Sequence, residues 1–164
     1  MNLDGLVAKI TEINNKLLEE KNPVALPESQ HKYLLTLIAK LRDPAIYSYI
    51  REFLPAEMDY AEKLLKWAPE NCIPVIDLWR ILVTHHASQA YFSGVDSGIQ
   101  IMLAIVSKLK QGPPVVLSVF FKMLSNMLIH SNNQTGFIKA KDMILTAIQL
   151  VNPTDAKVIG LVAN

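Results

Sequence analysis

The lone cysteine, Cys72, is the first of three kinds of side chain in this sequence that could do chemistry. It lies near the predicted start of a helix, where a thiol pKa can fall and the thiolate becomes available as a nucleophile. The flanking residues Asn71, Ile73 and Pro74 form no small-residue elbow that would expose it. A small buried core residue is the commoner outcome for such a cysteine. A thiol-dependent enzyme stays as an alternative, but the sequence favours a protein that is not an enzyme.

Histidines are the second kind of side chain, because imidazoles bind metals. His85 and His86 are adjacent, and adjacent side chains on a helix diverge by roughly 100°. His31 and His130 lie in different predicted helices, with no cysteine or carboxylate at ligand spacing, so surface or helix-capping roles are favoured. The chain also lacks zinc-finger spacing, a dinucleotide fingerprint and a P-loop. We therefore expect no metal and no cofactor.

Isolated cations within apolar segments are the third kind. Arg80 belongs to a polar stripe at spacings i, i+3 and i+7 with Asp77 and Thr84. A second stripe consists of Ser118, Lys122, Ser125 and Asn126. A charge-assisted hydrogen bond from such a cation to an incoming carboxylate is worth about 1.5 to 3 kcal/mol. Two alternatives remain open, in which Arg80 only pairs with Asp77 and Lys122 only extends to solvent.

These side chains need a helical frame, and apolar residues do recur at helical spacing almost throughout. No segment alternates with a two-residue period for long enough to indicate a sheet. Residues 22–27 are predicted as a linker and residues 131–134 as a polar loop. Helices are predicted over residues 3–21, 28–41, 46–53, 57–67, 74–86, 97–110, 115–130 and 138–151, with a last one from 154.

A repeat emerges when the chain is compared with itself at an offset of 42 residues. Arg80 then falls on Lys122 and Thr84 falls on Asn126, and apolar residues 101–103 fall on 143–145. This period is typical of armadillo and HEAT units. The predicted fold is all-α, an armadillo/HEAT-like right-handed solenoid. Its stacked helices would place the two stripes side by side on the inner face, as a groove with cations at corresponding levels and Trp79 as a wall.

Composition limits the class of protein. The 164 residues, 51% hydrophobic, suit a single monomeric domain over 1–164, with 1–27 as an N-terminal helix and linker. A net charge of +1 without basic runs argues against nucleic-acid binding, and the apolar stretches are too short to span a membrane. A single cysteine fits a reducing compartment, so we expect a cytoplasmic and nuclear protein. The chain stops inside an apolar helical pattern, which predicts a fragment lacking later repeats.

One region resembles a known family. Leu65-Lys66-Trp67-Ala68-Pro69-Glu70, then Pro74-Val75-Ile76-Asp77-Leu78-Trp79-Arg80 and His85, are similar to the signature of the PUL domain. This domain occurs in phospholipase-activating protein and its fungal ubiquitin-fusion-degradation relatives. The family shows a Leu-x-Lys, a Pro-Glu, a Pro-x-x-Asp-x-x-Arg helix and a downstream His in similar order. Weaker similarity extends from about Leu6 to the end, including Lys122 to Asn126.

The resemblance implies an armadillo-like adaptor of the ubiquitin-proteasome system, whose cationic groove binds the acidic C-terminal tail of the AAA ATPase valosin-containing protein. Arg80 matches the family's helix arginine, and Lys122 stands where a basic residue, often Arg, occurs. A Lys at that position loses bidentate carboxylate binding. We expect Thr84, Ser118 and Asn126 to hydrogen-bond the peptide backbone. A HEAT-type assembly scaffold that binds partner helices through apolar edges is the main alternative.

Overall fold

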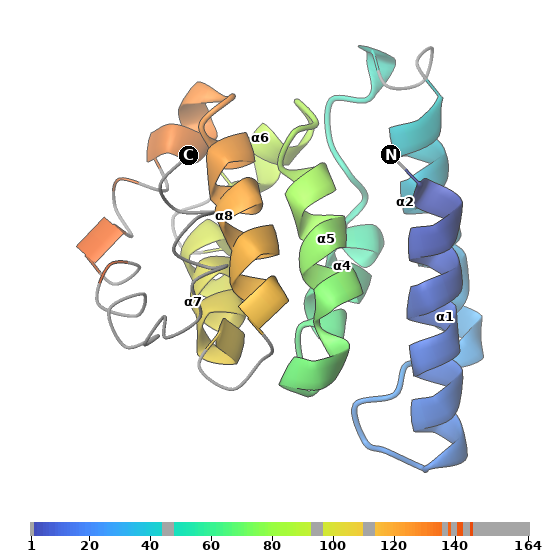
Figure 1. The fold of residues 1–164 in the computed structure, drawn as a ribbon. Coiled ribbons are helices and arrows are strands. Elements are labelled where there is room, and N and C mark those ends of the chain that lie inside the picture. Colours follow the sequence, from blue (N-terminus) through green and yellow to red (C-terminus); the bar gives the residue numbers. More distant parts are fainter. Residues whose placement is uncertain are drawn as a thin grey trace.

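Helices joined by short turns make up the part of the chain that the structure, a computed structural model, describes (Figure 1). This part covers residues 2–43, 48–92, 97–109 and 114–135, and the single positions 138, 141, 142 and 145. Within these residues no strand occurs. The predicted all-α class is confirmed.

Helix α1 (Leu3–Glu19) confirms the first predicted helix. It begins at Leu3 because the side chain of Asn2 accepts a hydrogen bond from the backbone N–H of Gly5 at 2.8 Å. The linker after it is held against the helix by the buried Asn14. The Asn14 side chain accepts from the N–H of Leu26 at 2.8 Å and donates to the Leu26 carbonyl at 2.9 Å.

The segment between the second and third long helices differs from the prediction. After a short 3-10 turn (Glu28–Gln30), helix α2 spans His31–Arg42 and helix α4 spans Pro55–Leu64. The helix predicted over 46–53 is wrong at its end, because residues 50–53 are not helical; residues 44–47 lie outside the described residues. Pro55 favours an extended residue before it, and Leu54 has a ψ of 143°.

Helix α5 (Ile73–Leu82) follows a 3-10 turn (Pro69–Asn71) and ends four residues before the predicted position 86. His85 and His86 therefore lie in a turn and not on the helix. Helix α6 (Ser88–Phe92) was not predicted, whereas α7 (Ser97–Leu109) and α8 (Pro114–Met127) match predicted helices.

Residues 131–135 are helical, so the prediction of a polar loop over 131–134 is wrong. The reason is the buried Asn133, whose side chain donates to the carbonyl of Val83 and to the hydroxyl of Ser88, both at 3.3 Å. Tertiary contacts thus override the polar composition. Of the helix predicted over 138–151, only 138, 141, 142 and 145 are described, all helical. The helix from 154 lies outside the described residues.

The helices form two layers (Figure 1). Helices α1, α5 and α8 lie next to each other in one layer, and α2, α4 and α7 cover them from behind. The core between the layers contains Trp67 and Trp79, both 0% exposed. The indole N–H of Trp67 donates to Val24 O at 3.2 Å, and that of Trp79 donates to Ala61 O at 3.3 Å. The front layer is the surface that carries the predicted polar stripes.

Hydrogen bonds between α5 and α8 join residues that are 46 positions apart, one helical turn more than the repeat offset of 42. Asn126 bonds to the carbonyl of Arg80 and His130 to that of Thr84, both at 2.8 Å, so the two helices run parallel. A shift of four residues keeps the same face of a helix, so the apolar pattern fits an offset of 42 or 46.

Candidate peptide-binding site

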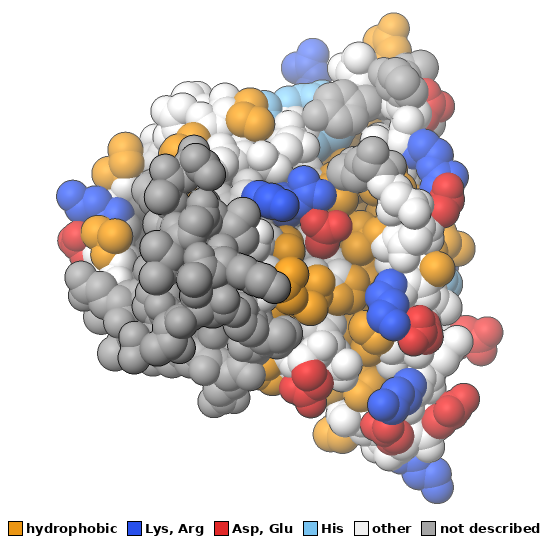
Figure 2. All heavy atoms as spheres, viewed as in Figure 1, with side chains coloured by type: hydrophobic (Ala, Val, Ile, Leu, Met, Phe, Trp, Pro, Cys, Tyr) orange, Lys and Arg blue, Asp and Glu red, His pale blue; other side chains and the backbone are white. Residues whose placement is uncertain are grey.

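The surface where α5 and α8 lie side by side brings together most of the predicted site residues. We call it the α5–α8 face and define it by Asp77, Arg80, Thr84, Ser118, Lys122 and Asn126. Basic and acidic side chains meet over these two helices in Figure 2. The face is thus built by the parallel packing of two helices from neighbouring units.

Arg80 is the central cation of the α5–α8 face. Its Nε donates to Oδ1 of Asp77 at 2.6 Å, with 25% of the Arg80 side chain and 35% of the Asp77 side chain exposed. The structure therefore shows the pairing that the sequence left open as an alternative. Because a guanidinium has five N–H donors and this bond uses one, Arg80 can still donate to a second carboxylate.

Lys122 is the second cation, and it is exposed on α8. In the part of the chain that the structure describes, it has no ion-pair partner. It lies one turn before Asn126 and one turn after Ser118, so these three side chains follow one line along the helix. Asn126 is bonded to the Arg80 carbonyl, and Lys122 lies about 6 Å before Asn126 along α8.

Two of the predicted backbone-binding residues already make hydrogen bonds within the protein. Asn126 Nδ2 donates to the Arg80 carbonyl, and Thr84 Oγ1 donates to Ile81 O at 2.7 Å. Trp79 is fully buried with its indole N–H bonded, so it supports the α5–α8 face from below and is not the predicted groove wall. Its large apolar ring packs in the core, so it does not line the surface.

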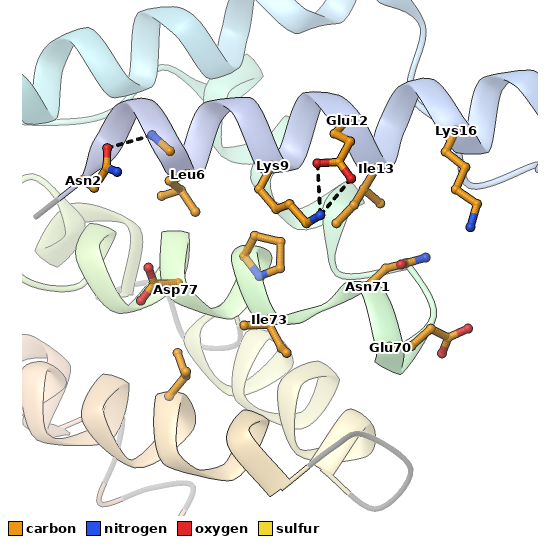
Figure 3. A pocket seen from close by; sticks show the side chains of 13 residues that line it. Asn2, Leu6, Lys9, Glu12, Ile13, Lys16, Glu70, Asn71, Ile73 and Asp77 are labelled. Atoms are coloured by element: carbon orange, nitrogen blue, oxygen red, sulfur yellow. Dashed lines mark hydrogen bonds and ion pairs between the residues drawn. The ribbon is translucent and has the colours of Figure 1, made fainter.

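A groove between α1 and α5 was missed at the level of sequence. It has a volume of about 720 Å³, and we call it the α1–α5 groove (Figure 3). Its floor is apolar, formed by Leu6, Ile13, Ile73, Pro74 and Val119 from three helices. In Figure 2 the corresponding hollow is lined by hydrophobic side chains. The spacing of Leu6 and Ile13 on α1 was a signal for this floor, but nothing in the sequence indicated that α1 lies beside α5.

Charged side chains form the rim of the α1–α5 groove. Lys9 and Lys16 extend from α1 toward α5, and Glu70 and Asp77 stand on the opposite side (Figure 3). Lys9 is paired with Glu12 at 2.8 Å, with about half of its side chain exposed. Asp77 thus belongs to this rim and to the ion pair with Arg80, so the groove is continuous with the α5–α8 face.

Cys72 is a core residue and not a nucleophile. It is 0% exposed, its Sγ donates to the carbonyls of Trp67 and Ala68 at 3.3 Å each, and burial raises its pKa to about 11. A thiol in that state is protonated at neutral pH. The alternative of a thiol-dependent enzyme at Cys72 is therefore wrong.

Three of the four histidines, His85, His86 and His130, lie just after the ends of α5 and α8. His85 and His86 stack with ring centroids 4.5 Å apart, because they lie in the turn after α5 and not on a helix as predicted. His85 Nδ1 accepts from the N–H of Ala87 at 3.0 Å. His130 Nε2 donates to the Thr84 carbonyl at 2.8 Å, which confirms a capping role for His130. Among the described residues, no group of three or more His, Cys, Asp or Glu could hold a metal ion.

Burial lowers the pKa of His85 to about 4, and the nearby His86, His130 and Lys40 add to this effect. The ring is therefore neutral at pH 7, with its proton on Nε2. Within the described residues, no helix is both long and apolar enough to cross a membrane.

Comparison with known proteins agrees with this architecture. A family model described as the PUL domain matches residues 1–159. No curated protein and no solved structure gives a significant match. The PUL domain is an armadillo-like helical repeat fold, and it acts as a non-catalytic module that binds valosin-containing protein in the ubiquitin pathway. Since the match covers nearly the whole chain, this protein belongs to the PUL domain family.

Proposed function

We propose that the α5–α8 face binds the acidic C-terminal tail of valosin-containing protein, with Arg80 as the main carboxylate anchor and Lys122 as the second. The observation that carries this proposal is the partly exposed Arg80 guanidinium, held in place by Asp77 next to the exposed Lys122. Cys72 is a free, buried thiol, which fits a role in the reducing cytoplasm and nucleus.

The separation of the two cations favours an extended ligand. Neighbouring helix axes lie about 8–10 Å apart. Side chains on one face of an extended chain are spaced two residues, about 6.6 Å, apart, because successive side chains point to opposite faces. Since the side chains of Arg80 and Lys122 are long, an acidic peptide with carboxylates two residues apart can engage both cations at once.

Backbone contacts to the peptide use acceptors that the internal bonds leave available. An amide side chain offers two donor hydrogens and an acceptor oxygen, and a hydroxyl both donates and accepts. We assign Asn126 Oδ1 and the half-buried Ser118 hydroxyl to these contacts. Asp77 orients Arg80 in the free protein and competes with the ligand for it.

Titration of the protein with a fluorescein-labelled acidic tail peptide, followed by fluorescence anisotropy, tests the proposal. Arg80→Glu should weaken binding by more than tenfold, because a charge-assisted hydrogen bond worth about 1.5 to 3 kcal/mol is lost and a repulsive charge is added. Arg51→Glu is the matched control, since Arg51 is exposed in the segment between α2 and α4 and is not one of the residues that define the α5–α8 face. Unchanged affinity in the Arg80 variant would refute the assignment.

Asp77→Asn provides a second, opposite readout. Removing the internal carboxylate should strengthen binding roughly two- to fivefold, because partly exposed ion pairs are worth about 1 kcal/mol or less. Weaker binding in this variant would mean that Asp77 serves the ligand by orienting Arg80 and does not compete with it.

A second candidate function is an assembly scaffold that binds partner helices through apolar edges. It is favoured by a hollow of about 360 Å³ between α1 and α2, where Leu35 is 49% exposed. Binding through that edge would be insensitive to Arg80→Glu and would depend weakly on salt.

A further inference from the structure

The α1–α5 groove lies on the same face of the molecule and has no role in carboxylate binding. Its volume of about 720 Å³ lies within the range of roughly 300–1,000 Å³ typical of ligand sites. Half-buried Ile13, Ile73 and Val119 pack against the core from below and present their remaining surface to the groove. Binding of an apolar group to this floor is favourable, because it removes apolar surface from water.

The rim of the groove does not favour a charged ligand. Lys9 is paired with Glu12 and Lys16 lies 3.9 Å from Glu20, while Glu70 and Asp77 face them from the other side. The positive charges that can attract a carboxylate lie on the neighbouring α5–α8 face, at Arg80 and Lys122. The front surface is thus divided into an apolar half at α1–α5 and a cationic half at α5–α8, and Asp77 lies at the boundary of both halves.

We infer that the α1–α5 groove binds large apolar side chains of the same acidic peptide, next to the carboxylates held at the α5–α8 face. This inference rests on the proposed function. The ligand is therefore a peptide with two parts, an acidic stretch and a flanking apolar stretch. The specificity of the domain lies in the apolar part, because surface carboxylates are common to many peptides and an apolar pair beside them is not.

The test is a double-mutant cycle between peptide and protein. Two labelled acidic peptides carry a pair of leucines, one on the amino-terminal and one on the carboxyl-terminal side of the carboxylates. For the peptide whose direction fits, changing the leucines to alanine should weaken binding to the unmodified protein about tenfold, as expected for apolar side chains that become buried. The same change should cost at most about threefold on Ile13→Ala, because the two contacts are coupled.

Ile50→Ala is the matched control, since Ile50 is another half-buried isoleucine packed against the core but away from the groove. Changing the leucines of the peptide to alanine should still weaken binding to Ile50→Ala about tenfold. The inference would be overturned by an equal loss of affinity on the unmodified protein, Ile13→Ala and Ile50→Ala, or by no loss with either peptide. If Arg80→Glu still abolishes binding in that case, the proposed function stands and only the groove assignment fails.

A labelled protein gives a readout that does not depend on a core substitution. Lys9→Cys, carrying an environment-sensitive dye, places the probe on the groove rim, and Cys72 is buried and stays unlabelled. The leucine peptide should shift the emission of this dye and the alanine peptide should not. The same dye at exposed Lys32 on α2 should respond to neither, and an equal response at both positions would contradict groove occupancy.

Discussion

At the scale of single residues, His85 shows how a ring in the family signature contributes without touching a ligand. It is buried against Phe53, with ring centroids 5.1 Å apart, and stacks on His86. Its Nδ1 accepts a backbone N–H, so adding a proton there breaks a hydrogen bond and places a charge close to His86, His130 and Lys40. His85 is therefore a structural group that works only when neutral.

The stability of the domain should consequently fall in mild acid. The pKa of His85 is lowered from 6.5 to about 4 in the folded state, so its contribution is complete above pH 6.5 and is lost as the pH falls toward 4. Up to roughly 3 kcal/mol of unfolding free energy is involved, since a tenfold change in proton affinity corresponds to about 1.4 kcal/mol. Urea denaturation at pH 7 and at pH 4.5 measures this loss.

The control for this prediction is the histidine substitution itself. His85→Gln should flatten the pH dependence between 7 and 4.5, whereas His31→Gln should leave it unchanged. A profile that is identical in the His85 variant and the unmodified protein would assign the acid sensitivity to other groups.

At the scale of elements, the junction between α5 and α8 depends on side chains of the later helix. Asn126 and His130 bond to carbonyls at the end of α5, and Asn133 reaches Val83 and Ser88 just beyond it. Those carbonyls belong to the last turn of α5 and the residues after it, which have no partner within their own helix. The contact of the two helices is thus specified by hydrogen bonds as well as by apolar packing.

Asn133→Ala should destabilise the protein by about 1 to 3 kcal/mol, because it leaves buried polar groups without their partner. The neighbouring Asn132 is exposed and serves as the matched control, for which a change within about 0.5 kcal/mol is expected. Thermal unfolding of the two variants, followed by circular dichroism, measures the difference. Equal midpoints would show that Asn133 does not fasten the junction.

The long helices were predictable because their apolar residues recur every three to four positions, as in α1, α7 and α8. The helix ends were not, since they depend on tertiary contacts such as those of Asn133 and of Trp67. The contact offset of 46 residues could not be distinguished from 42 for a related reason, because a helical pattern repeats itself after about four residues. The spacing predicted that Arg80, Asp77 and Lys122 share a surface, whereas the burial of Trp79 and the α1–α5 groove required the packed structure.

At the scale of the whole molecule, the net charge is only +1, so no long-range field draws an acidic partner to the domain. Attraction must come from the few cations of the α5–α8 face. Such local charges act over a distance that falls from about 10 Å in 0.1 M salt to about 3 Å in 1 M salt. The arrangement of the helices, and not the overall charge, therefore determines which peptides bind.

Affinity for the acidic peptide should fall severalfold between 0.1 M and 1 M sodium chloride, because screening weakens the contacts of Arg80 and Lys122. The apolar contacts should remain and slow the decline. Anisotropy titrations across this range measure the slope, and Lys122→Gln should reduce it. A slope near zero would favour the scaffold function at the α1–α2 edge.

The bonds from α8 to the end of α5 also bear on how the array unfolds. A helix whose last carbonyls are capped by the following unit cannot fray alone, so the two units are thermodynamically linked, as nearest neighbours in a one-dimensional chain. Amide hydrogens in the last turn of α5 should therefore exchange at the rate set by the opening of α8. We therefore expect no limit of a cooperative unit between α5 and α8.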